Sequence, residues 1–235
     1  LGSRFLRAAP IGSDGVPMAV ADWLDLVTPT DCAGCARPGQ PLCRSCRATV
    51  LCCRPSLLPI AAPAVPYLIA SGVYTGVLRQ VILAHKSRLH PTLVEALAGS
   101  LRAAVKLFCQ VVRATGGWRT PMLAVPVPPS RRWSGRRPVR ELLAEPEWSA
   151  THTTPADLLL AARWRRPQKS LSAQQRSVNM RGALRCRAVA RELCGTRVVI
   201  VDDVVTTGAS IAAAAETLTR AGFEVMGAAV IARAW

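Results

Sequence analysis

Two adjacent acids and a group of small residues lie close together near the end of the sequence. Asp202 and Asp203 follow the apolar run Val198–Val201, and the next polar stretch is Thr206–Ser210. Carboxylates accept hydrogen bonds from hydroxyl groups, and the backbone N–H groups of small turn residues bind anions. The predicted phosphate-binding residues are Thr206, Thr207, Gly208, Ala209 and Ser210. Because ribose 5-phosphate carries both hydroxyls and a phosphate, this spacing predicts a ligand of that kind.

A strand and a helix must hold these residues in place. The four β-branched residues at 198–201 are typical of a parallel strand that is covered on both faces, and ligands bind at the carboxyl edge of such a sheet. The Ala-rich run Ile211–Leu218 predicts a helix whose positive end adds to the phosphate site. The alternative is an ordinary strand-to-helix turn with a capping Ser or Thr, which does not require two adjacent acids after a buried strand.

Four cysteines near the N-terminus form two Cys-x-x-Cys pairs. The residues are Cys32, Cys35, Cys43 and Cys46. Four thiolates at this spacing predict a closed structural zinc site, in which metal binding substitutes for the core that so short a segment lacks. Two disulfides are the alternative, and a reducing compartment argues against them. We expect the nearby Cys52 and Cys53 to be buried thiols.

Basic residues follow two of the other predicted elements. The loop at 130–137 comes after the apolar strand Met122–Val127, and Lys86 lies in the last turn of a predicted helix, Gly76–Arg88. Clustered arginines bind pyrophosphate through bidentate contacts, and the alternative is a solvated basic surface. The predicted pyrophosphate-side residues are Lys86, Arg131, Arg132, Arg136 and Arg137.

Composition limits the class of protein. The chain has 235 residues and a net charge of +16, and half of its residues are hydrophobic. This length suits one α/β domain with a small appendage, and no apolar run is long enough for a membrane helix, so we expect a cytoplasmic protein. The charge fits a polyanionic partner such as nucleic acid, or merely a general bias toward arginine.

The remaining pattern divides the chain. We expect a disordered leader at 1–17, a helix at 21–27 within a zinc module at 18–54, a Pro-rich linker at 55–66, and one α/β domain at 67–235. Within that domain we expect strands at 67–74 and 158–164 and helices at 91–113 and 138–148. The polar segment 165–185 has the composition of a mobile lid.

Two resemblances follow from these motifs. The stretch 198–210 resembles the 5-phosphoribosyl-1-pyrophosphate (PRPP) loop of type I phosphoribosyltransferases at every position. The wider chain is similar to the ComF family of competence-associated, phosphoribosyltransferase-like proteins. That similarity rests on the cysteine pairs, on Tyr74–Arg79, on Val125–Pro128, and on a spaced pattern within 165–182 that includes Gln168, Leu171, Arg176, Asn179 and Gly182.

The resemblance implies a type I phosphoribosyltransferase fold, a mostly parallel sheet flanked by helices, preceded by a zinc-ribbon-like module. It implies that Asp202 and Asp203 bind the ribose hydroxyls, that the lid contributes Gln168, Lys169, Arg176 and Asn179, and that Mg²⁺ accompanies PRPP. The implied reaction transfers a ribosyl 5-phosphate group to an acceptor, commonly a nucleobase nitrogen, with release of pyrophosphate.

One motif departs from the family pattern. ComF proteins usually carry Arg-Gly-Phe-Asn after the pyrophosphate-side loop, whereas this chain has Arg137-Pro138-Val139-Arg140. Contacts made by that Asn therefore do not carry over. The alternative function is a non-catalytic module of the same fold that binds single-stranded DNA and works with the competence machinery.

Overall fold

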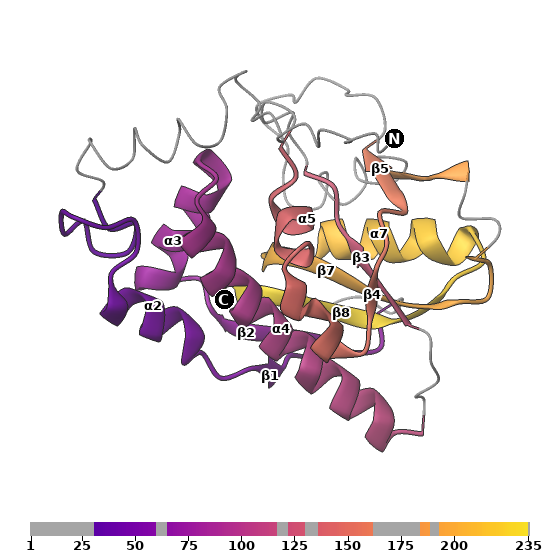
Figure 1. The fold of residues 1–235 in the computed structure, drawn as a ribbon. Coiled ribbons are helices and arrows are strands. Elements are labelled where there is room, and N and C mark those ends of the chain that lie inside the picture. The colour runs from indigo at the N-terminus through magenta and orange to yellow at the C-terminus, as the bar shows by residue number, and fades with distance from the viewer. Residues whose placement is uncertain are drawn as a thin grey trace, which may run out of the picture.

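The computed structural model describes residues 31–59, 65–116, 122–129, 136–161, 184–188 and 193–234. Six strands form the main sheet in the order β1-β2-β8-β7-β3-β4, in which β1 pairs antiparallel with β2 and every other neighbouring pair is parallel (Figure 1). The strands are β1 (Ser56–Leu57), β2 (Leu68–Val73), β8 (Glu224–Arg233), β7 (Arg197–Val205), β3 (Met122–Pro126) and β4 (Thr154–Pro155). The mostly parallel sheet predicted from the sequence is confirmed.

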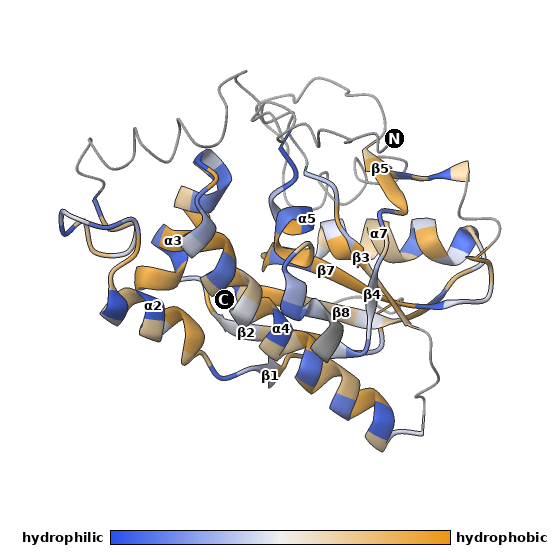
Figure 2. Cartoon of the chain, in the orientation of Figure 1, coloured by the Kyte–Doolittle hydropathy of each residue, from blue (hydrophilic) through white to orange (hydrophobic). Residues whose placement is uncertain are grey.

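Helices cover both faces of this sheet. The face that carries Val199 and Val201 packs against α3 (Gly76–Ser87) and α4 (Pro91–Ala114), and the face that carries Val198 and Ile200 packs against α7 (Ala209–Arg220). Successive strand residues point to opposite faces, so an uninterrupted apolar run fills two cores at once. Figure 2 shows the central strands largely in orange, with hydrophilic residues on the outer sides of the helices.

The α4 helix forms the centre of the first core. Pro91 stands at its first turn, where a missing N–H costs nothing, and the His90 side chain accepts a hydrogen bond from the Thr92 N–H. Its buried residues recur at helical spacing from Leu93 through Leu97 and Leu101 to Phe108. This stripe lies against β2 and β8.

The four-cysteine segment is part of the same core. Cys32, Cys43 and Cys46 are buried in the cluster that includes Leu78 of α3, and the short helix α2 (Arg44–Leu51) packs on α3 and α4. At the surface, Arg47 of α2 forms an ion pair with Glu95 of α4. The segment therefore shares apolar contacts with the helices that flank the sheet.

A bulge between β7 and β8 requires glycine. Val198 lies opposite Val225, but Val199 lies opposite Gly227, so β8 carries one extra residue at Met226. Gly227 has φ 146°, and a Cβ at this position would stand 2.3 Å from the Tyr67 carbonyl oxygen. Only a residue without a side chain lets β8 approach Tyr67 this closely.

Several expectations about the elements need correction. The helix expected at 138–148 ends early, as α5 (Pro138–Leu143), because Pro146 interrupts it and begins the 3₁₀ helix η1 (Pro146–Thr151). Within the strand expected at 158–164, the described residues form β5 (Leu159–Ala161), which pairs antiparallel with β6 (Leu184–Cys186) in a separate sheet. Residues 162–164 lie outside the described part of the chain. Within the stretch expected to be a linker, Ser56–Leu57 forms strand β1 of the main sheet. The closing strand β8 is an element that the sequence analysis did not name.

The remaining expectations concern Cys52 and Cys53 and the segments that lie outside the described residues. Cys52 is exposed and Cys53 is only half-buried, because both follow the last turn of α2 at the surface. The leader, the helix expected at 21–27 and the lid residues from 165 to 183 lie outside the described residues. The domain boundaries stay predictions.

Candidate functional site

The acidic pair and the phosphate turn lie at the carboxyl end of β7. Asp202 and Asp203 belong to the strand, which continues to Val205, so the acids stand on β7 instead of beyond its end. Gly208 caps α7 with φ 74° and ψ 0°, a left-handed conformation that suits glycine. The recess at this turn is lined by Asp202 and by residues 204–211. The start of α7 therefore presents backbone N–H groups beside two carboxyl groups.

Lys86 joins this site from another helix. Its Nζ lies 2.8 Å from Oδ2 of Asp203, so the last turn of α3 is fastened to β7. The Asp203 N–H donates a hydrogen bond of 2.8 Å to Oδ1 of Asp202. Lys86 was predicted on the pyrophosphate side, and here it stands next to the carboxylate predicted to bind ribose hydroxyls. A cation, two carboxyl groups and a helix N-terminus thus meet at one edge of the sheet.

The two carboxyl groups do not have the same environment. Burial raises the pKa of Asp202 well above its ordinary value of 3.8, and the neighbouring charge of Asp203 adds to this increase. The folded state therefore binds more protons than the unfolded state between that ordinary value and the raised pKa, so the stability contributed by this group falls as the pH rises through that window. At a pH above the ordinary value, the buried carboxyl of Asp202 therefore lowers the free energy of unfolding relative to an uncharged group of the same shape.

We expect Asp202→Asn to raise the melting temperature at neutral pH by roughly 2–4 °C for each kcal/mol recovered, because the amide keeps the acceptor for the Asp203 N–H without the charge. Thermal unfolding of both proteins near neutral pH and near pH 4 measures this. The difference should shrink at the lower pH, where the wild-type carboxyl is protonated. If Asp202→Asn melts below wild type near neutral pH, the buried carboxyl of Asp202 does not destabilise the fold.

A buried histidine connects this site to α5. His85 is 3% exposed, and its Nε2 lies 3.1 Å from the carbonyl oxygen of Pro138 and 3.8 Å from a carboxylate oxygen of Glu141. Burial lowers the pKa of His85, so the neutral imidazole donates its Nε2 proton to the carbonyl. Arg136 holds Glu141 through two hydrogen bonds of 3.2 and 2.6 Å. This network fixes the start of α5 relative to α3.

His85 is a residue of this site that the sequence analysis did not name. It continues the stripe of Leu78, Val81 and Ile82, the other buried residues of α3. The helical spacing of that stripe was the signal in the sequence that placed His85 on the inner face.

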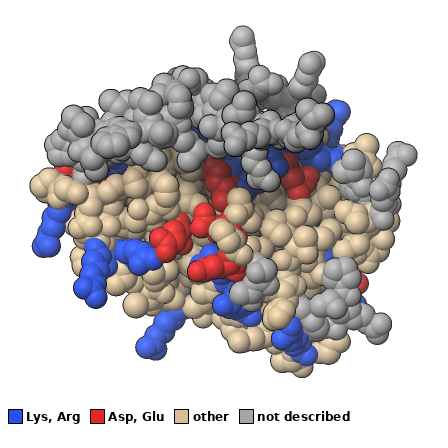
Figure 3. Space-filling model, viewed as in Figure 1, with Lys and Arg blue, Asp and Glu red and all other residues tan. Residues whose placement is uncertain are grey.

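The predicted cations divide into two groups. Lys86, Arg136 and Arg137 are described, and each forms an ion pair with a carboxylate, Asp203, Glu141 and Asp157 respectively. Figure 3 shows acidic and basic side chains gathered along this edge of the described surface. Other predicted site residues lie outside the described part of the chain. They are Arg131, Arg132, Gln168, Lys169, Arg176 and Asn179.

The four predicted cysteine ligands come together. The sulfur atoms of Cys32, Cys35, Cys43 and Cys46 all lie within 4.8 Å of one another, and those of Cys35 and Cys43 are 3.8 Å apart. Tetrahedral zinc with bonds of about 2.3 Å requires sulfur atoms to be roughly 3.8 Å apart, so the cluster fits such an ion. All nine cysteines are free thiols, which is contrary to the disulfide alternative.

Hydrogen bonds favour the thiolate at one end of the cluster, whereas burial and the neighbouring cysteines raise the pKa of the Cys46 thiol. The hydroxyl of Ser45 and the N–H of Cys46 lower the pKa of the Cys43 thiol to about 6. The Cys43 N–H itself donates to the sulfur of Cys32 over 3.2 Å. Metal ligation requires deprotonated sulfur, and a bound cation would offset the mutual repulsion of four thiolates.

A second hollow lies elsewhere. It measures about 540 Å³ and lies at the opposite edge of the sheet, lined mainly by Thr219, Phe223, Glu224 and Val225. Glu224 is its one charged residue in the described part of the chain, and its carboxylate pairs with Arg197. This hollow therefore does not offer an anion the contacts found at the β7–α7 turn.

Comparison with known proteins bears on the same edge of the sheet. Residues 154–234 match the family model described as the phosphoribosyl transferase domain, and this range includes β7, the phosphate turn and α7. The C-terminal part of the chain is therefore similar to a phosphoribosyl transferase domain. The match begins at β4, so the cysteine cluster, α3 and α4 lie before it. No curated protein matches the chain.

Strands β7 and β8, in the region that matches the phosphoribosyl transferase domain, share one hydrophobic core with the four-cysteine cluster, whose sulfur atoms could hold a metal ion. No helix in the described ranges is long and apolar enough to cross a membrane.

Proposed function

We propose that this protein is a phosphoribosyltransferase of the ComF type, which binds PRPP and transfers its ribosyl 5-phosphate group to an acceptor with release of pyrophosphate. The observation that carries the proposal is the β7–α7 turn within the matched domain, where a left-handed glycine, a helix N-terminus and an acidic pair adjoin one recess. A sugar with hydroxyls and a 5-phosphate offers complementary groups to each.

In this proposal the acids and the turn hold opposite ends of the ribose. The N–H groups around Gly208 and Ser210 bind the 5-phosphate, and the carboxyl groups of Asp202 and Asp203 accept hydrogen bonds from the ribose hydroxyls. This anchoring fixes C1 of the ribose relative to the protein, which lowers the entropic part of the barrier.

Lys86 changes its partner in the proposed reaction. In the absence of ligand it neutralises Asp203, and its flexible side chain gives it reach toward a phosphate group near the same carboxylate. As the bond from C1 to pyrophosphate breaks, positive charge develops on the ribose and negative charge on the leaving group. Lys86 then stabilises the leaving group while the acids stabilise the ribose.

Two metals belong to the proposal. The acidic pair supplies carboxylate oxygens, the ligands that Mg²⁺ prefers, and magnesium bound with PRPP supplies neutralisation of the departing pyrophosphate. The four-cysteine cluster would hold zinc with no open position for chemistry, so we assign it a structural role.

A release assay tests the proposal. Protein, PRPP and Mg²⁺ are incubated with a panel of purine and pyrimidine bases, and free pyrophosphate is measured; at least one base should raise release above the rate without an acceptor. The test variant is Lys86→Met, which removes the cation beside Asp203 and should lower the rate of pyrophosphate release by about 10- to 100-fold. If no acceptor gives release and the protein instead binds single-stranded DNA with a steep dependence on salt, the non-catalytic alternative holds.

A further inference from the structure

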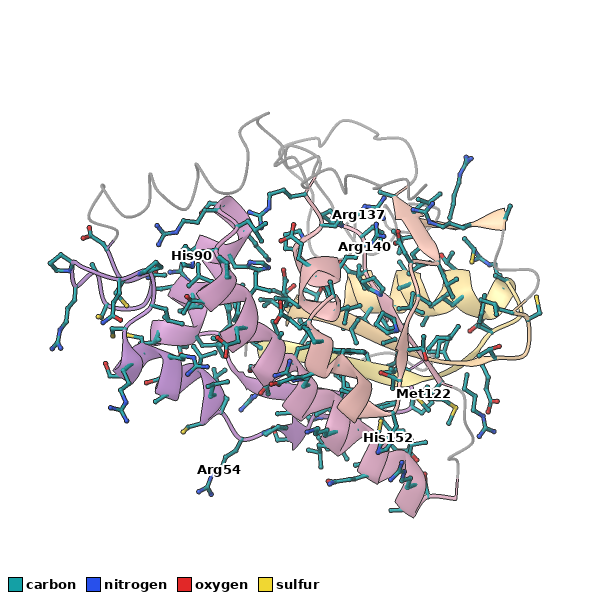
Figure 4. The ribbon with its side chains drawn as sticks, in the orientation of Figure 1. Arg54, His90, Met122, Arg137, Arg140 and His152 are labelled. Carbon is teal, nitrogen blue, oxygen red and sulfur yellow. The ribbon has the colours of Figure 1, made fainter. Side chains whose placement is uncertain are left out.

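Three arginines meet on one carboxylate beside the site described above. Oδ2 of Asp157 lies 2.6 Å from Nη1 of Arg137, 3.0 Å from Nη2 of Arg187 and 3.4 Å from Nη1 of Arg140. Figure 4 labels Arg137 and Arg140, which lie between the start of α5 and strand β5. We call Asp157 with these three residues the arginine cluster.

The backbone holds the cluster in place from three elements. Asp157 lies in the short connection between β4 and β5, where the Ala156 N–H donates to the Ala124 carbonyl of β3. Arg187 directly follows β6, and its own N–H donates to the carbonyl of Leu158 over 2.9 Å. Arg137 and Arg140 stand at the start of α5. The four side chains therefore converge from β4, β6 and α5.

The charges in the cluster do not balance. Arginine stays protonated at any ordinary pH, so three positive charges face one negative charge. Among the described residues, Asp157 is the only carboxylate in ion-pair contact with Arg137, Arg140 or Arg187. Within the described ranges, two of the three positive charges have no carboxylate of their own, and all three arginine side chains are between one third and three fifths exposed. Gathering like charges this closely costs free energy, and a second bound anion would reduce that cost.

Donor groups remain available in the cluster. Each guanidinium has five N–H donors. In the described part of the chain, Arg137 and Arg187 each donate one hydrogen bond to Asp157, and Arg140 lies at ion-pair distance from it. Nε of Arg187 is buried and has no hydrogen-bond partner among the described residues. Planar guanidinium groups bind the oxygen pairs of carboxylates and phosphates in bidentate geometry. The unused donors therefore suit an oxyanion.

The cluster is distinct from the groups around Asp203. Two neighbouring parts of α5 face different partners, because the Pro138 carbonyl and Glu141 contact His85, whereas Arg137 and Arg140 contact Asp157. Lys86 directly follows His85 in α3 and pairs with Asp203, whereas the arginine cluster contains none of these residues. These two groups of residues flank α5, so a ligand at one group is close to the other without sharing its contacts.

We infer that the arginine cluster is a binding site for a small oxyanion, a carboxylate or phosphate group, with Asp157 as the internal counter-ion that gathers the guanidinium groups before the ligand arrives. Arg140, Arg187 and Asp157 are assigned no role in the proposed PRPP site. The inference rests on the proposed function only for the source of the oxyanion, which is either an anionic group of the acceptor or the pyrophosphate of PRPP.

The first test measures binding of inorganic phosphate and inorganic pyrophosphate by calorimetry at low ionic strength. Arg140→Gln with Arg187→Gln removes the two surplus charges but leaves the Arg137–Asp157 pair, and it should weaken binding of pyrophosphate at least tenfold. The charge-matched control is Arg47→Gln with Arg220→Gln, two exposed arginines that each pair with one glutamate elsewhere. The control should bind within twofold of wild type.

A second variant is expected to bind phosphate more tightly, a result that a loss of folding cannot produce. Asp157→Asn removes the internal counter-ion, so phosphate should bind several-fold more tightly than to wild type. Thermal unfolding of each variant shows whether it is folded. The inference is overturned if the glutamine pair and Asp157→Asn both bind phosphate and pyrophosphate as the charge-matched control does.

A third measurement distinguishes the two sources. If the oxyanion belongs to the acceptor, protein saturated with PRPP and Mg²⁺ still binds phosphate, and the glutamine pair abolishes this binding while PRPP affinity is kept. If it is the pyrophosphate of PRPP, saturation blocks phosphate, and the glutamine pair weakens PRPP but not ribose 5-phosphate. Failure of the proposed function appears separately, as a wild-type protein that binds neither PRPP nor ribose 5-phosphate.

Discussion

Replacement of Cys46 by serine is expected to remove the bound metal and to lower the melting temperature by ~10 °C or more. Structural zinc contributes on the order of 10 kcal/mol to the folding of small zinc modules, and a serine oxygen replaces a thiolate poorly. Cys46 is 4% exposed, and a Cβ on the facing Gly34 would stand 2.7 Å from its sulfur and 2.9 Å from Val77 of α3. The site is too closely packed to accommodate a different metal ligand.

The effect should extend beyond the cysteine segment. Cys46 shares a core with Leu78 and Val81 of α3, and the far end of α3 carries Lys86. Loss of the metal should therefore loosen the helix that fastens to Asp203. The cysteine segment and the ligand site are thus linked through α3.

Cys52→Ser is the matched control, because this exposed thiol lies six residues further along the same segment, outside the cluster. It should keep one equivalent of metal by elemental analysis and an unchanged melting temperature. Full metal content and wild-type melting in the Cys46 variant would contradict a structural role for the cluster.

The second large effect concerns the phosphate turn. Gly208→Val places a β-branched residue at φ 74°, a conformation that such residues rarely adopt, so the turn must move away from the phosphate. We expect affinity for PRPP and for ribose 5-phosphate to fall by ~100-fold or more. Asp203→Asn keeps the turn but removes the charge that strengthens hydrogen bonds from ribose hydroxyls, and should cost about 1.5–3 kcal/mol in affinity for either ligand.

Two further variants separate strain from binding. Gly195→Val introduces the same side chain at φ 81° and far from the site, so it tests the effect of strain alone and should leave PRPP affinity intact. Gly208→Asn keeps the left-handed conformation and adds a side chain near the phosphate, so it should weaken PRPP while folding normally. Equal losses for Gly195→Val and Gly208→Val would attribute the effect to folding.

Much of the fold could be predicted because local signals agreed with tertiary structure. The apolar run at 198–201 predicted a strand buried on both faces, and the stripes after Gly76 and Pro91 predicted α3 and α4. The bulge at Gly227 could not be predicted from the sequence, because it depends on how closely β8 approaches Tyr67, which is distant along the chain.

The site was only partly predictable, for a related reason. The types and spacing of residues 202–210 suggested their chemistry, but their partners come from elsewhere in the chain. The pair of Lys86 with Asp203 depends on how α3 docks on β7. The arginine cluster forms only because β4, β6 and α5 lie next to one another in the fold, and no sequence pattern around Asp157 predicted it. It includes the stretch Arg137–Arg140 that departs from the ComF pattern.

The measurement that tests the central claim most directly is a calorimetric titration of PRPP with Mg²⁺ into the wild-type protein and into Gly208→Val. The account predicts saturable binding at one site per chain in the wild type, competition by ribose 5-phosphate, and a loss of ~100-fold or more in the variant. A wild-type protein that is folded and holds its metal, yet shows no saturable binding of PRPP, would contradict it.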